Sequence, residues 1–242
     1  MIKIAQITDL HISSENTLKD GLDAKQRCID VLNDIKSKEI DLIIVSGDLV
    51  NSHDDIKSYK WIKRHLNNLN KNIIILPGNH DSIVSISKIF DMSTYLKYDD
   101  MYFSVEAESF ILVFLDSSKE FLGKVQLEWL DNLSMKTDSN IVIFVHHPLD
   151  YCGCEFMDRK YPLQNIPEVK KQLAKYNNIK YIFTGHYHTE KQINIGNIIQ
   201  YLTPSTWYQI NGDIEGYNIC NKYGWREIDI EQNSLITTVH YI

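Results

Sequence analysis

The chain has 242 residues, and its 25 basic and 32 acidic side chains give a net charge of −7, which disfavours a protein that coats nucleic acid with a basic surface. Hydrophobic residues make up 43% of the sequence, enough for a sizeable core, and this excludes intrinsic disorder. The length predicts one larger domain spanning residues 1–242.

The first third of the chain predicts strands that alternate with helices. Three short isoleucine-rich runs (residues 2–7, Asp41–Ser46 and Asn72–Leu76) are typical of strands buried on both faces. Between them, apolar residues recur at helical spacing over Leu22–Lys38 and Asp55–Leu69. Because a crossover helix joins parallel strands, this order predicts a parallel sheet.

The rest of the chain is richer in strands. The middle third predicts, in order, a hairpin (Tyr102–Ala107 and Phe110–Leu115), a helix (Val125–Leu133), a strand (Ile141–Val145), a helix (Glu168–Tyr176) and a strand (Tyr181–Phe183). The last third predicts antiparallel strands joined by Gly-Asn and Gln-Asn turns: Gln192–Ile195, Ile198–Leu202, Trp225–Ile230 and Leu235–His240. We therefore predict an α/β fold with two mixed sheets.

Polar clusters follow five of the predicted strands at their C-terminal ends, where open α/β sheets place their ligand sites. Six of the nine histidines lie in these clusters. Each cluster alone is compatible with an ordinary turn, cap or strand end, but five at equivalent positions indicate one shared site. The clusters are Asp9-x-His11, Gly47-Asp48, Gly78-Asn79-His80-Asp81, His146-His147-Pro148 and Gly185-His186-Tyr187-His188.

The residue types in these clusters predict a metal site. Imidazole, carboxylate and amide oxygen suit manganese, iron or zinc. Residues i and i+2 of an extended segment point the same way, so Asp9 and His11 can hold one ion, and His186 and His188 can face one site together. Asp48, Asn79 and His186 each directly follow a glycine. Glycine lets the backbone come close at a point where a side chain would block the approach. Two carboxylates and four imidazoles are too many ligands for one ion, but they fit two ions that share a carboxylate.

In order and spacing, these five blocks resemble the full signature of calcineurin-like metallophosphoesterases, from Asp9 to His188. The resemblance implies a four-layer fold in which two mixed sheets pack as a sandwich flanked by helices. A finer resemblance is to bacterial class III cyclic-nucleotide phosphodiesterases. It lies in His147-Pro148-Leu149, Gly153-Cys154, Met157-Asp158, Thr203-Pro204-Ser205-Thr206 and Tyr223-Gly224-Trp225-Arg226.

The family resemblance also implies a role for each candidate residue. One ion would be held by Asp9, His11, Asp48 and His188, and the other by Asp48, Asn79, His146 and His186, with Asp48 bridging. His80 would face the substrate and stabilise or protonate the leaving group, and Asp81 would orient His80. The implied reaction is in-line attack on phosphorus by a hydroxide that bridges ions roughly 3.5–4 Å apart.

The resulting hypothesis is a dinuclear metal-dependent phosphodiesterase for small diesters, with 3′,5′-cyclic nucleotides such as cyclic AMP favoured. Two divalent ions, two carboxylates and a hydroxide leave a net charge of about +1, which a diester monoanion neutralises, although a ferric ion would reverse that preference. A glycerophosphodiester, a phosphomonoester, a nucleotide-sugar lipid or a nucleic-acid end stays open as substrate. A non-catalytic scaffold of the same fold is disfavoured because all seven ligand positions are retained.

Several features around the site are left undecided by the sequence. Nothing in it determines whether Cys152, Cys154, Trp207 or Tyr208 lines the substrate pocket, and a homodimer is one of the oligomeric states left open. His147 is expected to support the site rather than to bind metal. Only about twenty residues separate Asp81 from Tyr102, which predicts a site without a large cover and open on one side.

The sequence shows no sign of a membrane segment or of secretion. Its longest apolar run, Phe110–Leu115, has six residues, whereas a membrane helix needs about 20. The N-terminus meets polar residues too early for a signal peptide, and the four cysteines form no CxxC pair. We therefore expect a cytoplasmic protein whose partner is a small phosphodiester, with no membrane partner and with nucleic acid disfavoured as a partner.

Overall fold

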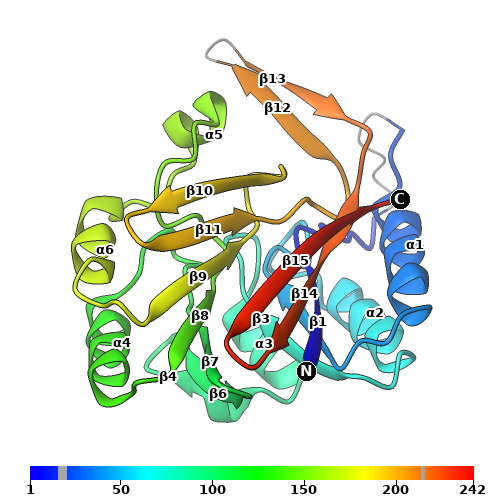
Figure 1. The fold of residues 1–242 in the computed structure, drawn as a ribbon. Helices are drawn as coiled ribbons and strands as arrows, with labels where there is room; N and C mark the ends of the chain where they lie inside the picture. Colours follow the sequence, from blue (N-terminus) through cyan, green and yellow to red (C-terminus); the bar gives the residue numbers. More distant parts are fainter. Residues whose placement is uncertain (16–20, 214–215) are drawn as a thin grey trace.

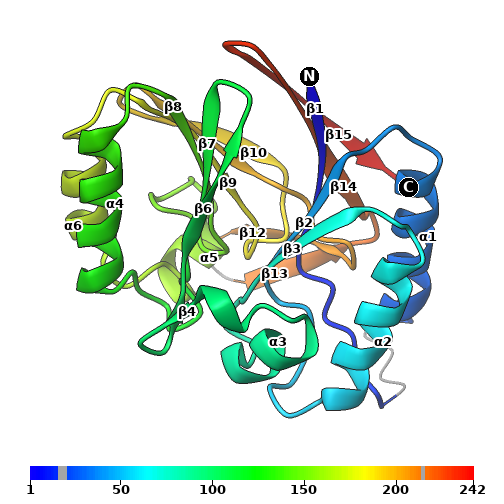
Figure 2. The same cartoon turned by 90° about the horizontal axis from the view of Figure 1, so that it is seen from below.

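Two β-sheets pack against each other between two groups of helices, in four layers (Figures 1 and 2). The computed structural model describes residues 1–15, 21–213 and 216–242. Helices α1 and α2 cover one side and α4 and α6 the other, while α3 lies at an edge of the sheets (Figure 2). This arrangement confirms the α/β sandwich expected from the sequence.

The first sheet has the strand order β15-β14-β1-β2-β3. Its parallel strands β1 (Ile2–Ile7), β2 (Leu42–Ser46) and β3 (Asn72–Leu76) fall where the isoleucine-rich runs predict them. Helices α1 (Ala24–Lys36), α2 (Ile56–Asn67) and α3 (Ile83–Ile89) follow the three strands in turn, and the antiparallel strands β14 (Gly224–Glu231) and β15 (Ser234–Tyr241) extend the sheet beyond β1.

The second sheet has the strand order β10-β11-β9-β8-β7-β6. In chain order its elements are β6 (Phe103–Ala107), β7 (Phe110–Phe114), α4 (Lys124–Lys136), β8 (Asn140–Phe144), α6 (Ile166–Leu173), β9 (Ile179–Thr184), β10 (Lys191–Ile195) and β11 (Ile198–Leu202). The sequence predicts one run of antiparallel strands in the last third of the chain, but these strands are divided between the two sheets. The hairpin β10–β11 joins this sheet, with β11 parallel to β9, whereas the hairpin β14–β15 joins the other sheet.

Aromatic rings line the face of the second sheet that meets the first. Neighbouring rings stack across the strands with centroids 4.7 to 5.5 Å apart, in the pairs Phe103–Phe114, Phe114–Phe144, Phe144–Phe183 and Phe183–Tyr201. Each fully buried ring of this kind contributes about 1.5–3 kcal/mol. Aliphatic residues that alternate with the rings face α4 and α6, among them Val113, Ile143 and Ile182. Because successive side chains of a strand point to opposite faces, the rings are buried on one face of the sheet and the aliphatic residues on the other.

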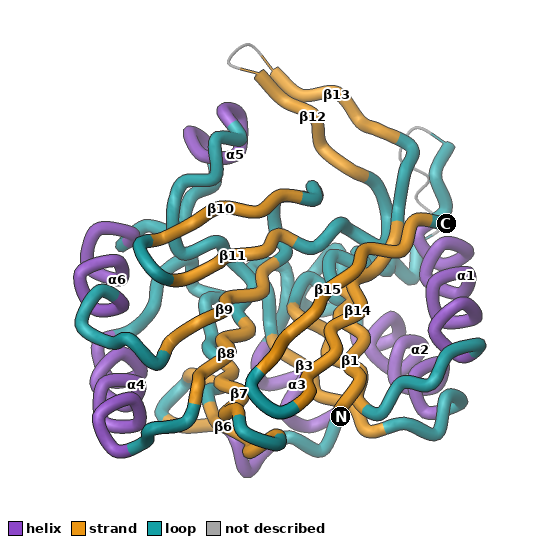
Figure 3. Tube along the Cα trace, in the orientation of Figure 1, coloured by secondary structure: helices purple, strands orange, loops and turns teal. Residues whose placement is uncertain are grey.

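Several elements were not predicted, because most are very short and the hairpin of β12 (Gln209–Asp213) and β13 (Gly216–Cys220) has no dense apolar run. The short ones are β4 (Leu96–Lys97), β5 (Asp100–Met101), a 3₁₀ turn at Ser93–Tyr95 and α5 (Glu155–Lys160). Helix α5 and the β12–β13 hairpin lie together beyond one end of the sheets (Figures 1 and 3). Over the described residues, no helix has the length and apolar character needed to cross a membrane.

Candidate metal centre

Five loops meet where the parallel strands of the two sheets end. Asp9 and His11 follow β1, Asp48 follows β2, and the loop of Asn79 and His80 follows β3. The loop after β8 carries His146, and the loop after β9 carries His186 and His188. The two sheets therefore bring all seven candidate ligands to one edge of the sandwich, as the sequence predicts.

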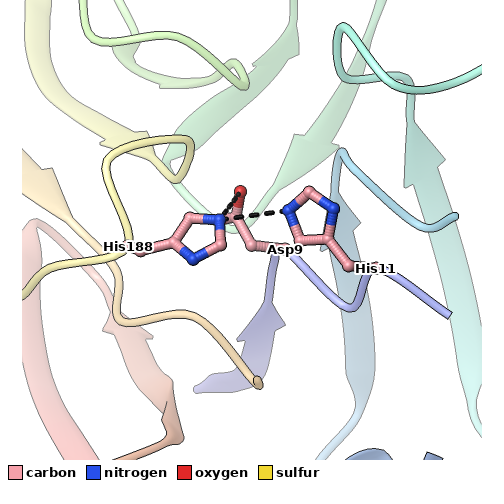
Figure 4. A group of neighbouring side chains, drawn as sticks. All are labelled: Asp9, His11 and His188. Atoms are coloured by element: carbon pink, nitrogen blue, oxygen red, sulfur yellow. Dashed lines mark hydrogen bonds and ion pairs between the residues drawn. The ribbon is translucent and has the colours of Figure 1, made fainter. Parts of the chain in front are cut away.

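The ligand atoms form two groups, and in each group they lie within 4.8 Å of one another: Asp9, His11 and His188, and Asp48, His146 and His186. Figure 4 shows the first group, whose three side chains point toward one another. There, His188 Nε2 lies 3.3 Å from Asp9 Oδ1 and 3.1 Å from His11 Nε2.

Asp48 connects the two groups. Its Oδ2 atom lies 3.3 Å from His146 Nε2 and 3.6 Å from His11 Nε2, so one carboxylate faces both groups. A third set of atoms within 4.8 Å joins Asp48 and His11 to His80. The shared carboxylate is the feature that a pair of neighbouring ions requires.

Several buried polar atoms in these groups lack a hydrogen-bond partner. Six such side-chain atoms occur among the described residues, and four are at this site: Asp9 Oδ1, His11 Nδ1, Asn79 Oδ1 and His146 Nε2. A buried polar atom left without a partner costs about 1–3 kcal/mol. Asp9 Oδ1, Asn79 Oδ1 and His146 Nε2 fit a divalent transition metal, which would satisfy them on binding. His11 instead faces the ligand groups through Nε2.

Backbone carbonyl groups fix the orientation of three imidazoles. His146 Nδ1 donates to Ser46 O at 2.9 Å, and His188 Nδ1 donates to Tyr208 O at 3.1 Å. His186 uses its other nitrogen, since Nε2 donates to Tyr161 O at 2.9 Å. Because a carbonyl only accepts, the neutral form of each ring holds its proton on that nitrogen, and the opposite nitrogen is the one that can bind a metal.

The ligand loops are not extended, which corrects the reason expected for their convergence. Asp9, His11, Asp48, His186 and His188 all have positive φ angles, between 44° and 65°. Such left-handed backbone is costly for residues other than glycine and is concentrated at functional sites. His186 and His188 consequently face different groups rather than one.

Glycines make room where the loops cross, as the sequence predicts. A Cβ atom on Gly78 would overlap the carboxylate and backbone nitrogen of Asp48, and one on Gly185 would overlap Thr8 and the Asp9 carboxylate. Gly47 lies equally close to the His146 ring. The backbone therefore touches the ligands directly at these points.

Substitution Gly78→Ala is expected to displace Asp48 and to lower kcat/KM by about 10²-fold, because misplacement of a reacting group by about 1 Å has that cost. Elemental analysis of the purified variant should show less bound manganese. Gly216→Ala is the matched control, since a Cβ there meets nothing within 4 Å. Equal manganese content in both variants would contradict the expectation.

Burial and opposite charges act against each other on the titrating groups. Burial alone would raise the pKa of Asp9, but His188 and His146 outweigh it and lower the pKa to about 2. Burial alone would lower the pKa of His146, but the carboxylates of Asp48 and Asp9 raise the pKa to about 9. For Asp48, burial likewise acts to raise the pKa, but His146 and His11 outweigh it and lower the pKa. Both carboxylates are therefore ionised at neutral pH and attract cations.

Asp81 differs from the expectation that it orients His80. Its buried carboxylate accepts hydrogen bonds from Gly78 N at 2.9 Å, Leu49 N at 3.1 Å and the Tyr59 hydroxyl at 3.1 Å. Leu49 and Gly78 lie in the loops that carry ligands after β2 and β3, and Tyr59 lies on α2. Asp81 therefore joins the two loops, and its described hydrogen bonds do not reach the His80 ring.

His80 lies beside the ligand groups and is partly exposed. Its backbone N–H donates to Asp48 Oδ1 at 2.9 Å, its ring packs edge-on against His11 with centroids 5.0 Å apart, and its Nδ1 lies 3.3 Å from Asn51 O. His147 instead packs behind the site, with its ring 4.0 Å from that of His186 and its Nδ1 2.9 Å from Ser117 Oγ.

A pocket of about 600 Å³ opens over the ligand groups. Part of its wall comes from α5 and the β12–β13 hairpin. The expectation of a site open on one side did not include these elements, because it considered only the chain between Asp81 and Tyr102. Trp207 and Tyr208 line this pocket, whereas Cys152 and Cys154 are not among the described lining residues. The described lining also contains no lysine or arginine. It comprises His11, Asp48, Asn51, Asn79, His80, Glu120, Phe156, Met157, Tyr161, His186, His188, Trp207, Tyr208, Ile210 and Tyr217.

Comparisons with known proteins agree with this geometry. A profile of the family described as Calcineurin-like phosphoesterase matches residues 2–190. A Fibrobacter succinogenes protein named "Probable cyclic nucleotide phosphodiesterase" is 33% identical, over 100% of this chain and 94% of that protein. The Escherichia coli protein named 3′,5′-cyclic adenosine monophosphate phosphodiesterase CpdA is 27% identical, over 98% of this chain and 88% of that protein.

Among solved structures, a dimetal phosphatase from Danio rerio shares the fold, with a TM-score of 0.77 at 11% identity over 98% of this chain and 95% of that one. The chain belongs to the calcineurin-like phosphoesterase family. The enzyme class expected from the sequence, a metal-dependent phosphoric ester hydrolase, is confirmed.

Proposed function

We propose that this protein is a dinuclear metal-dependent phosphodiesterase that hydrolyses small phosphodiesters, with 3′,5′-cyclic nucleotides such as cyclic AMP as the favoured class. The observation that carries the proposal is the pair of ligand groups that share Asp48 on the floor of the pocket. The proposal places the reaction in the cytoplasm, which agrees with the free state of all four cysteines.

Each half of the proposed centre has its own ligands. One ion is held by Asp9, His11, Asp48 and His188, and the other by Asp48, Asn79, His146 and His186, with manganese, iron and zinc as the metals that suit these atoms. When bound, two such ions activate water as a nucleophile and neutralise charge on the phosphate.

His80 is proposed to act on the leaving group. It lines the pocket beside Asp48, and its imidazole can donate a proton to the departing alkoxide oxygen. Asp81 acts indirectly, because its carboxylate holds the loops of Asp48 and His80 together. We therefore assign Asp81 a positioning role.

The charge of the pocket favours diesters over monoesters. No lysine or arginine appears in its described lining, and Glu120 adds a carboxylate near the rim. A monoester dianion carries two negative charges, which only the metals would neutralise, whereas a diester carries one negative charge. Repulsion by Glu120 acts more strongly on the dianion.

The walls of the pocket suit a flat apolar group such as a nucleobase. Tyr161 and Tyr217 are 53% and 42% exposed and present ring surface to the pocket, and Phe156 lies between them, 4.9 Å from Tyr217 by ring centroids. The relatives in Fibrobacter succinogenes and Escherichia coli, both named for cyclic nucleotides, support the same substrate class.

A substrate panel with manganese tests the proposal. Steady-state kcat/KM would be measured for cyclic AMP, bis-p-nitrophenyl phosphate, glycerophosphocholine and p-nitrophenyl phosphate, with metal-depleted protein as the control. We expect both cyclic AMP and the aryl diester to be hydrolysed, and to be preferred over the monoester.

Two outcomes would contradict different parts of this proposal. A monoester preferred over every diester by about tenfold or more would overturn the diesterase assignment. Good turnover of the aryl diester without turnover of cyclic AMP would overturn the cyclic-nucleotide assignment alone.

A further inference from the structure

Helix α5 is attached at two points to the segment that carries His186 and His188. One attachment runs through a side chain, Asp158, and the other through the backbone at the end of the helix. The helix also forms one wall of the pocket. A single short element thus contacts both the proposed substrate site and a proposed metal ligand.

The first attachment is centred on the Asp158 carboxylate. Its Oδ1 accepts from the Tyr187 hydroxyl at 3.0 Å and from Cys152 N at 3.0 Å, and its Oδ2 accepts from Cys154 N at 2.8 Å. Tyr187 is 1% exposed and separates His186 from His188 in the chain. Asp158 therefore binds the loop before α5 to the middle of the ligand segment.

The second attachment orients a proposed ligand. Tyr161 directly follows α5, and its carbonyl oxygen accepts the hydrogen bond from His186 Nε2. The position of that carbonyl depends on the helix, since Tyr161 N donates to Met157 O at 2.9 Å. Movement of α5 would therefore move the group that fixes the tautomer and the angle of the His186 ring.

The other ligand group is held from elsewhere. His188 Nδ1 donates to Tyr208 O, and Ser205 Oγ donates to Asp9 O at 3.0 Å, so both are fixed by the loop after β11. None of these contacts passes through α5. One contact links the two groups, because the His186 N–H donates to Asp9 Oδ2 at 3.0 Å, but the other supports of the two proposed metal positions are separate.

We infer that Asp158 is a positioning residue that, through Tyr187 and α5, holds His186 ready for the second metal ion and fixes the adjoining wall of the pocket. The inference rests on the proposed function, because it takes His186 as a ligand of the second ion. It adds that the second ion depends on the Tyr187–Asp158 contact more than the first ion does, because the first is connected to this segment through the His186 N–H bond to Asp9.

Substitutions Tyr187→Phe and Asp158→Asn test this dependence in the full chain. Manganese would be titrated into metal-depleted protein and followed by calorimetry and by the electron paramagnetic resonance signal of the coupled manganese pair. We expect the second ion to bind about tenfold more weakly, the lower end of the usual cost of losing a group that supports a ligand, and the first ion to be weakened less. Activity lost at low manganese should return at saturating manganese.

The control is a second tyrosine–aspartate contact far from the site. The Tyr176 hydroxyl donates to Asp131 between the outer helices, so Tyr176→Phe and Asp131→Asn remove the same kind of hydrogen bond. These variants should bind both ions as the wild type does. Thermal unfolding of all four metal-depleted variants would show any loss of stability separately.

Two results would overturn the inference while the proposed function stands. One is wild-type affinity for both ions in Tyr187→Phe and Asp158→Asn, and the other is an equal weakening of both ions. A wild-type chain that binds fewer than two ions would instead overturn the proposed function, and the inference with it.

Discussion

Replacing Asp48 with asparagine is expected to weaken both metal ions at once and to abolish turnover. The carboxylate lies 3.3 Å from His146 and 3.6 Å from His11, so its charge acts on both ligand groups. An amide keeps the shape but removes the negative charge that two neighbouring cations need between them. The loss of affinity for each ion should exceed the 10–100-fold typical of groups that only support a ligand.

Manganese titration of metal-depleted Asp48→Asn measures this effect directly. Asp131→Asn is a suitable control, since its carboxylate lies on the outer helices and contacts Tyr176 and Lys175. Weakening of one ion alone would show that Asp48 is not shared. Unchanged binding of both would remove it from the centre altogether.

Substitution His80→Ala is expected to keep both ions and to lower kcat by about 10²–10⁴-fold, the range typical of a group that transfers a proton. His80 lines the pocket, and its ring lies beside His11 rather than inside either of the two ligand groups that Asp48 connects. The loss should be smaller for a diester with a good leaving group such as p-nitrophenolate, because that oxygen departs without a proton.

Metal content and leaving-group dependence together test the role of His80. His65→Ala is the control, because His65 packs on Trp61 with ring centroids 3.9 Å apart, outside the described lining of the pocket. A metal ion lost from His80→Ala would make His80 a ligand, as its distance to His11 and Asp48 allows. Equal losses for good and poor leaving groups would exclude proton donation.

Local patterns were sufficient for the long elements of the fold. Strand β3 was predicted with its observed bounds, and the Gly-Asn turn at Gly196 and the Gln-Asn turn at Gln232 both close hairpins as expected. These predictions succeed because hydrophobic period and turn chemistry are properties of neighbouring residues. The pairing of β11 with β9 could not be predicted, since it depends on how the hairpin docks rather than on its own sequence.

By itself, the sequence determined which residues form the candidate centre, because each ligand lies next to a strand end or a glycine in a short, dense pattern. The family resemblance already placed His186 and His188 on different ions, as the two groups in the structure do. Only the tertiary structure showed that Asp81 is joined to Leu49 and Gly78. The walls of the pocket likewise depend on the tertiary structure. Left-handed ligand loops, the six-residue helix α5 and the β12–β13 hairpin are held by contacts between residues far apart in the chain, and no local pattern records such contacts.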